Sequence, residues 1–316
     1  MSSLQMASGT ECPSELWADV ERAYAHGLAS GAALPLLNTV VVLQEPAVPP
    51  PGWPCVVRVS AALAQKPVLA TGNARERPAV VQNPFLPYDK DLYVRHLPPR
   101  HVLLLNKYNA VPHHLLVVTA EFEPQSQPLS ASDLEAVFGV LRAMPGQGGL
   151  AFFNCGRESG HSQPHKHVQI VPLPLSLSEP GQLPMEAHVL LAARGAGPGA
   201  AFVPATLPFR AHCALIAPDA SAAATLAALL AASGAGGEGG SYNVLFTSSW
   251  AAVVPRTSEQ CCAEASPTGC AGVALNALGF AGTVLVRSQT ELAHIQRVGV
   301  AQMLQQTGVP LVANCQ

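Results

Sequence analysis

A short run near the middle of the chain constrains its fold more than any other feature. Between Pro164 and Val171, the residues His165, His167 and Gln169 recur at every second position. Side chains in a β-strand alternate between the two faces of the sheet. As a strand, this run therefore places two imidazoles and an amide on one face and Lys166 on the other, where we expect it to be structural.

The loop before this run is rich in glycine and serine. Gly156, Ser159, Gly160 and Ser162 permit tight turns in which backbone N–H groups and hydroxyls face an anion. A neutral histidine is a competent nucleophile whose tautomer can be fixed by a hydrogen bond. The local pattern favours phosphoryl chemistry, but paired histidines can also be metal ligands or hydrogen-bonded residues of a sheet.

Composition narrows the classes of partner. The chain has 316 residues, 49% of them apolar, and a formal net charge of −3 with 12% charged residues. We therefore expect a substantial core, no nucleic-acid partner and no membrane anchor. Because the chain has no broad basic surface, any anionic ligand must be bound by a few local cations. Eight scattered cysteines without a signal-peptide or transit-peptide pattern predict reduced thiols and a cytoplasmic protein.

The hydrophobic pattern predicts a strand-rich chain with few helices. Apolar spacing indicates helices over 14–28, 130–143, 221–232 and 291–307. Alternating or apolar runs indicate strands over 39–44, 55–59, 92–97, 101–106, 114–119, 150–155, 164–171, 242–246, 251–255, 273–275 and 283–287. Segments 194–199 and 234–240 are linker-like.

The histidine run and its flanks resemble a known family signature. Residues 159–169, with Asn154 ahead and 172–174 behind, are similar to the signature of the ATP adenylyltransferases, or diadenosine tetraphosphate phosphorylases, of the histidine-triad superfamily. Matching blocks follow in family order at 83–87, 105–114, 242–245, 253–256 and 276–282. The resemblance extends from about residue 16 to residue 310.

This resemblance implies a fold and a domain organisation. The expected fold is α+β and histidine-triad-like (HIT-like), mainly an antiparallel sheet with flanking helices. Residues 1–193 would form the catalytic domain, and residues 200–316 would form a C-terminal ATP adenylyltransferase domain that completes the nucleotide site.

The resemblance also implies a reaction. His167 would attack the α-phosphorus of a dinucleoside polyphosphate, expel ATP and retain AMP, which inorganic phosphate would take up to give ADP, reversibly. The expected ligands are dinucleoside polyphosphates, ATP, ADP and phosphate, with adenylyl sulfate as a further substrate in relatives. A divalent cation, Mg²⁺, is expected without an evident protein site, and no protein-bound metal is predicted.

Family binding positions can be carried over residue by residue. The implied substrate contacts are Lys66, Asn106, Lys107, Asn154, Gly160, His161, Ser162, Gln163, Gln169, Asn276, Ala277, Leu278, Thr283 and Arg287. Lys66, Lys107 and Arg287 would supply the cations. Hydrolytic relatives carry histidine at the position of Gln169, and an amide cannot shuttle a proton, so transfer is expected to prevail over hydrolysis.

The sequence departs from the family pattern in places. His161 stands where a small residue is common, and the segment from Cys261 to Cys270 looks like an insertion without paired Cys-x-x-Cys spacing. Two alternative functions stay open at this stage. One is a hexose-1-phosphate uridylyltransferase-like enzyme, and the other is a non-catalytic protein that binds or senses adenine nucleotides.

Overall fold

The computed structural model describes residues 13–45, 48–65, 83–175, 183–197, 199–217, 221–261 and 272–311. The predicted contact Lys66 and the segment 262–270 of the expected insertion lie outside these residues. The four described cysteines, which are Cys55, Cys155, Cys213 and Cys261, are buried.

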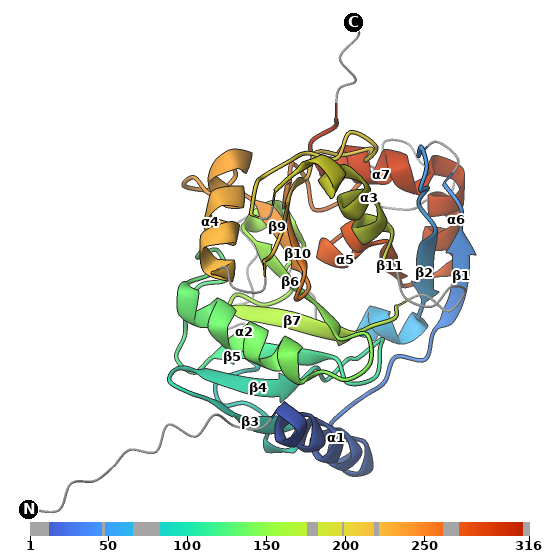
Figure 1. Ribbon diagram of the computed structural model, residues 1–316. Coiled ribbons are helices and arrows are strands. Elements are labelled where there is room, and N and C mark those ends of the chain that lie inside the picture. The colour runs from blue at the N-terminus through green and yellow to red at the C-terminus, as the bar shows by residue number, and fades with distance from the viewer. Residues whose placement is uncertain are drawn as a thin grey trace, which may run out of the picture.

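An eight-stranded antiparallel sheet forms the centre of the molecule (Figure 1). Its strands run in the order β3 (Tyr93–Leu97), β4 (His101–Leu105), β5 (Leu115–Thr119), β7 (His167–Pro172), β6 (Gly149–Cys155), β9 (Tyr242–Phe246), β10 (Trp250–Pro255) and β8 (His212–Leu215). Strand β6 pairs directly with β9. The expected boundary between 1–193 and 200–316 therefore falls within one continuous sheet.

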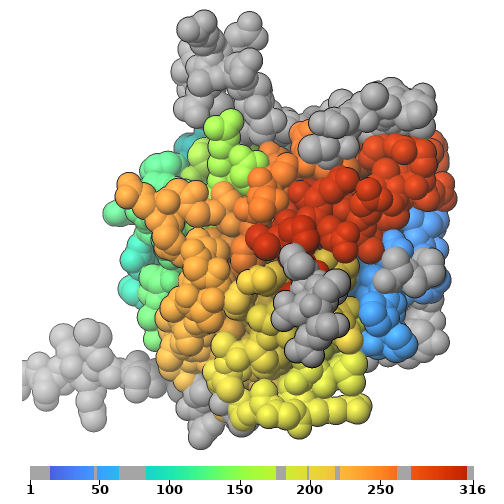
Figure 2. All heavy atoms as spheres, turned by 90° about the horizontal axis from the view of Figure 1, so that it is seen from above, coloured from blue at the N-terminus to red at the C-terminus, as the bar shows by residue number. Residues whose placement is uncertain are grey.

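A smaller sheet also joins the two ends of the sequence. It has the order β1 (Thr39–Leu43), β2 (Cys55–Val59) and β11 (Thr283–Val286), with β2 and β11 parallel. Figure 2 shows C-terminal residues, in red, beside the early strands, in blue. The N-terminal and C-terminal parts of the chain are thus connected in both sheets.

Helices cover the two faces of the large sheet differently. One face packs against α1 (Pro13–Ser30), α2 (Ala131–Ala143) and α4 (Ala222–Ser233). The other packs, over strands β6 to β10, against the small sheet and against α3 (Pro184–Ala192), α5 (Ala277–Ala281), α6 (Gln289–Val298) and α7 (Val300–Thr307). Short 3-10 helices are η1 (Ala61–Gln65), η2 (Lys90–Leu92), η3 (Arg157–Ser159) and η4 (Ala193–Gly195).

The second face carries two separate apolar clusters. One surrounds Phe152, Trp250 and Phe280, and the other joins Phe85 to Leu104 and neighbouring side chains of β4 and β5. Strand β7 lies between them in the sheet. The polar residues of β7 therefore sit in the interval between two hydrophobic cores.

The structure confirms the predicted α+β class with a mainly antiparallel sheet, but several element predictions were wrong or incomplete. The expected helix 291–307 is two helices, because Gly299 has φ 85° and interrupts the α-helical backbone. Ala274 forms only an isolated bridge to Gln260, not a strand. The predictions missed α3 and β8. No helix in the described ranges has both the length and the apolar character needed to cross a bilayer.

A buried ion cluster ties α2 to the strand that carries His167. Asp133 closes a capping box with Ser130 at the start of α2. Its carboxylate also lies 2.6 Å from Lys166 Nζ and 2.7 Å from His101 Nε2. Burial alone would raise the pKa of Asp133, but the hydrogen bonds from His101 and Lys166 outweigh burial and hold it well below its usual range. Lys166 thus faces α2, on the side of the sheet opposite to His167, as strand alternation predicts.

Removing the charge of Asp133 should destabilise the fold strongly. Asp133→Asn leaves Lys166 buried without its nearest anion, so the free energy of unfolding should fall by about 3–5 kcal/mol at pH 7. Because the pKa of Asp133 is lowered by folding, the wild-type advantage should shrink as pH falls below about 4. Urea unfolding at several pH values measures both effects.

Glu135→Gln is the matched control, since Glu135 is exposed on the same helix. Its effect should stay within about 0.5 kcal/mol. Equal losses for the two variants would contradict the assigned role of Asp133.

Candidate active site

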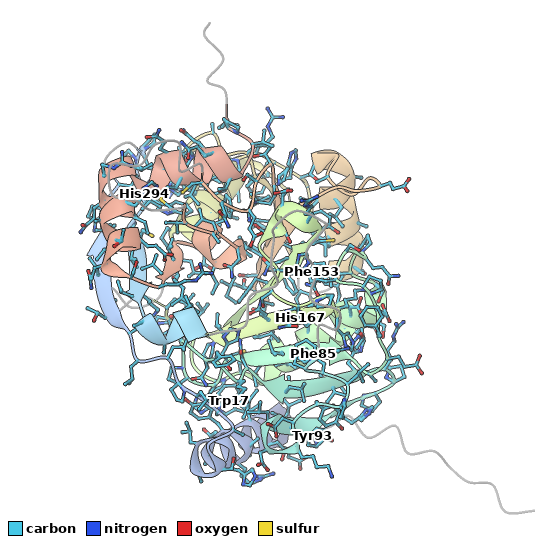
Figure 3. The ribbon with its side chains drawn as sticks, turned by 180° about the vertical axis from the view of Figure 1, so that it is seen from behind. Trp17, Phe85, Tyr93, Phe153, His167 and His294 are labelled. Carbon is cyan, nitrogen blue, oxygen red and sulfur yellow. The ribbon has the colours of Figure 1, made fainter. Side chains whose placement is uncertain are left out.

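His167 is the first residue of β7, and its ring is held in one tautomer. The side chain is 4% exposed, and Figure 3 shows it near the middle of the molecule with Phe85 close by; their ring centroids are 5.4 Å apart. Nδ1 lies 2.8 Å from the carbonyl oxygen of His165. Since a carbonyl only accepts, Nδ1 carries the proton in the neutral ring and Nε2 carries the lone pair.

His165 is held in the opposite tautomer. Its Nε2 lies 2.9 Å from the carbonyl oxygen of Thr119 and therefore donates to it. Its Nδ1 lies 3.0 Å from Asn83 Nδ2, and Asn83 Oδ1 is already oriented by the backbone N–H of Phe85. Both ring nitrogens of His165 are engaged within the protein. The structural interpretation thus fits His165, because both of its ring nitrogens have partners within the protein.

The side-chain amide of Gln125 lies between β7 and β6 beside His167 and forms hydrogen bonds to both strands. Gln125 is 2% exposed, and its Oε1 accepts from the backbone N–H of His167 at 2.8 Å. Its Nε2 donates to the carbonyl of Asn154 at 2.9 Å and to that of His167 at 3.3 Å. One side chain thus takes the place of backbone hydrogen bonds between the strands and fixes the backbone of His167.

The loop before β7 is shaped by close contact with the C-terminal part of the chain. Gly160 has φ 80°, and a Cβ atom there would lie 2.6 Å from the carbonyl oxygen of Leu275. Gly156 has φ 82° and lies equally tightly against Gly240 and Ser241. Neither position accommodates a side chain without backbone movement, so the predicted cradle is formed by both halves of the chain.

Polar groups of this loop are available to a ligand. His161 Nδ1 donates to the carbonyl of Gly156 at 3.0 Å, which leaves the Nε2 lone pair for other partners. Burial lowers the pKa of His161, while that hydrogen bond acts in the opposite direction, so the ring is neutral near pH 7. Gln163 Oε1 is buried and has no partner among the described residues. Ser162 is partly exposed in the same loop.

A row of polar residues crosses adjacent strands from β6 to the end of β10. Asn154 and Asn243 are cross-strand partners, and Asn243 Nδ2 donates to Asn154 Oδ1 at 2.8 Å. Arg256 Nη1 donates to Asn243 Oδ1 at 2.5 Å and to the carbonyl of Ser159 at 3.2 Å. Burial lowers the pKa of Arg256 to about 9, and Glu259 and Glu158 oppose that shift. The guanidinium stays cationic at neutral pH.

The predicted contacts at the start of α5 are partly engaged inside the protein. Ala277 is fully buried, and its N–H donates to Asn154 Oδ1 at 3.0 Å. The N–H of Leu278 donates to Asn276 Oδ1, which caps the helix. The structure therefore brings Asn154, Gly160, Asn276 and Ala277 together, with the Ala277 N–H serving Asn154.

Other predicted contacts lie around this centre. Asn106 Nδ2 approaches the ring of His114, and Gln169 pairs with Leu116 and Phe152 on the strands beside β7. Lys107 follows Asn106 and is exposed.

The last two predicted contacts lie on and just beyond β11. Thr283 is 5% exposed on β11, where it pairs with Val56 of β2. Arg287 lies beyond the end of β11 with its side chain 42% exposed. Its positive charge acts to lower the pKa of Glu259, against the larger effect of burial. Lys107 and Arg287 are exposed cations, whereas Lys166 and Arg256 are buried and fully engaged.

Metal-ligand clusters are absent from the part of the chain that the structure describes. Within it, no three His, Cys, Asp or Glu side chains converge as a metal site. Cys261 contacts His294 at 3.8 Å, remote in sequence from the histidine run.

Sequence reasoning missed the roles of three residues at this site: Gln125, Asn243 and Arg256. Asparagine is depleted in strands, so Asn243 within the apolar run 242–246 was a usable signal for a special role. Arg256, directly after another apolar strand, was a similar signal. Nothing in the sequence around Gln125 indicates that its amide would bridge two strands.

Comparisons with known proteins agree with this geometry. The profile of the Ap4A phosphorylase N-terminal domain matches residues 6–191, and that of the ATP adenylyltransferase C-terminal domain matches residues 205–310. Diadenosine 5',5'''-P1,P4-tetraphosphate phosphorylase 2 of Saccharomyces cerevisiae is 39% identical over 104 residues, which cover 29% of this chain and 32% of that protein.

Solved structures extend the similarity to almost the whole chain. Yeast Ap4A phosphorylase Apa2 in complex with AMP superposes with a TM-score of 0.73 at 25% identity, covering 95% of this chain and 98% of that one. The same enzyme in complex with Ap4A gives a TM-score of 0.73 at 25% identity, covering 94% and 98%. With one family profile matching more than half of its length, the chain belongs to the Ap4A phosphorylase family.

Proposed function

We propose that this protein is a nucleotidyltransferase that cleaves diadenosine tetraphosphate (Ap4A) with inorganic phosphate to give ADP and ATP, reversibly. The observation that carries the proposal is the tautomer of His167, whose Nδ1–H is bound to the carbonyl of His165 at 2.8 Å. The family assignment supports adenylyl transfer over the hexose-1-phosphate uridylyltransferase-like alternative.

In the first step, His167 Nε2 would attack the α-phosphorus of Ap4A. An N–P bond forms, the bond from that phosphorus to the bridging oxygen breaks, and ATP leaves with the electron pair. The ring becomes positively charged as the N–P bond forms, and the carbonyl of His165 stabilises that charge through the proton on Nδ1. AMP stays on His167.

In the second step, an oxygen of inorganic phosphate would attack the same phosphorus and displace Nε2. The products are ADP and the original neutral histidine. Gln169 would hydrogen-bond a phosphoryl oxygen without accepting a proton, so water is poorly activated beside the intermediate. Phosphate is already an anion and needs no such activation.

The predicted contacts would share the work of binding. The turn around Gly160, with His161, Ser162 and Gln163, would hold the phosphates, and Lys66, Lys107 and Arg287 would balance their charge. Asn106, Asn154, Asn276, Leu278 and Thr283 remain proposed contacts, with Ala277 acting through Asn154. Mg²⁺ would arrive with the polyphosphate. Adenylyl sulfate as a further substrate and a cytoplasmic location belong to the same proposal.

The covalent step is tested by replacing the nucleophile. Incubation with labelled Ap4A without phosphate should leave acid-labile AMP on the wild-type chain, whereas His167→Ala should show none and lose more than about 1000-fold in turnover. His26→Ala, at an exposed histidine of α1, is the control and should keep full labelling.

Circular dichroism should show that His167→Ala is folded, because the ring lies between the core clusters and adds little to either. Labelled AMP on a folded His167→Ala variant would sink the mechanism. An unlabelled, inactive wild-type chain that still binds Ap4A would support the non-catalytic alternative.

The preference for phosphate over water is tested by product analysis. With phosphate, the wild type should release ADP and ATP, and without phosphate AMP should accumulate far more slowly. Gln169→His restores a group that can carry a proton and should raise AMP release relative to ADP. Equal rates of AMP release by water and ADP release by phosphate in the wild type would refute the transferase assignment.

The cradle is tested by filling Gly160. Gly160→Ala puts a Cβ atom 2.6 Å from the Leu275 carbonyl, so the loop must move and kcat/KM should fall by about 100-fold. Gly146→Ala is the matched control, because Gly146 also has a positive φ but no atom near its Cβ position. The positive φ should cost each variant about 1 kcal/mol of stability, and Gly160→Ala should lose more because its Cβ also meets backbone. Equal kcat/KM for both would contradict the assigned cradle.

A further inference from the structure

We infer that Asn243 and Arg256 are positioning residues that fix the side-chain amide of Asn154, with its Oδ1 toward β9 and α5 and its Nδ2 left for a ligand. This inference rests on the proposed function and names residues of the C-terminal half that act through Asn154. Each is deeply buried: Asn154 is 1% exposed, Asn243 0% and Arg256 6%.

The orientation of both amides follows from donors that cannot be reversed. The backbone N–H of Ala277 donates to Asn154 at 3.0 Å, so the atom it meets must be Oδ1. A guanidinium has only donors, so the atom of Asn243 that meets Arg256 is likewise Oδ1. The remaining Nδ2 of Asn243 then donates to Asn154 Oδ1 at 2.8 Å.

The fixed amide of Asn154 has a defined free end. Its Oδ1 accepts from both Asn243 on β9 and Ala277 on α5. The amide is planar, so Nδ2 points away from the two donors that bind Oδ1. Among the described residues, no acceptor is recorded for this Nδ2. A donor without a protein acceptor suits a phosphoryl or ribose oxygen of the nucleotide.

The same pair also holds the turn that precedes the nucleophile. The carbonyl of Ser159 accepts from Asn243 Nδ2 at 2.9 Å and from Arg256 Nη1 at 3.2 Å. Arg256 satisfies its other donors with the carbonyls of Thr307, Ser258 and Leu275. Leu275 is the residue that Gly160 approaches most closely. Arg256 therefore orients the Asn243 amide and binds both Ser159, in the turn before His167, and Leu275, which faces Gly160.

The test replaces Asn243 with an isosteric group that cannot donate. In Asn243→Asp the carboxylate still accepts from Arg256, so the fold should persist, but two oxygens now face each other and the amide of Asn154 should turn over. We expect kcat/KM for phosphorolysis of Ap4A to fall about 10- to 100-fold and ADP binding to weaken. Thermal unfolding verifies that the variant is folded.

A double-mutant cycle separates positioning from general structure. Asn154→Ala removes the group through which Asn243 acts, so adding Asn243→Asp should change kcat/KM by less than about 2-fold in that background. Losses that multiply would overturn the inference. If Asn154→Ala does not fold, Asn154→Asp takes its place as a single variant: it keeps the acceptor, loses the donor, and should shift the same parameter, kcat or KM, as Asn243→Asp.

Asn38→Asp is the matched control, since Asn38 also accepts from an arginine, Arg58, at 3.3 Å. It makes the same change of charge outside the polar row and should keep wild-type kcat/KM. A folded Asn243→Asp variant with wild-type kcat/KM and ADP affinity would overturn the inference. An inactive wild type would count against the proposed function instead, and the cycle would then be measured on ADP affinity by calorimetry.

Discussion

The pairing of β6 with β9 is the contact on which the site depends. It joins the N-terminal and C-terminal halves of the chain in one sheet, and it sets Asn154 directly opposite Asn243. Without it, the loop at Gly160 would lose the wall formed by Leu275. The predicted cradle therefore depends on the joined halves, and His167 on β7 is one strand away from the junction.

Carbonyl oxygens, and not carboxylates, set the protonation of the two histidines. His167 donates from Nδ1 to a carbonyl, while His165 donates from Nε2 to another. A neutral acceptor fixes a tautomer without favouring the imidazolium as strongly as a carboxylate would. That arrangement suits a nucleophile that must be uncharged before attack. The two histidines, which are two positions apart, thus differ in which ring nitrogen carries the proton.

The fold was predictable wherever periodicity alone decided it. Alternation located β7 and sent Lys166 to the face of α2, and apolar spacing located α1 and α2. Prediction failed where long-range contacts decide the outcome. Alternation could not show that both nitrogens of His165 are taken by Thr119 and Asn83, which are distant in sequence. For the same reason, the Ala277 N–H could not be known to serve Asn154.

In the polar row of Asn154, Asn243 and Arg256, some hydrogen-bonding groups are paired within the protein and one is left for a ligand. Each amide or guanidinium buried in an apolar sheet must be satisfied, because an unmet polar group costs about 1–3 kcal/mol. Arg256 and the Asn243 amide are fully engaged, and satisfaction ends at Asn154, whose Oδ1 is engaged and whose Nδ2 is not. Gln163 Oε1, in the loop before β7, is buried without a partner in the described ranges. Bound phosphates can satisfy the amide nitrogen directly, and a protonated phosphate can satisfy the amide oxygen. The incomplete end of the row, nearest His167, is therefore the part of the sheet that gains most from a ligand.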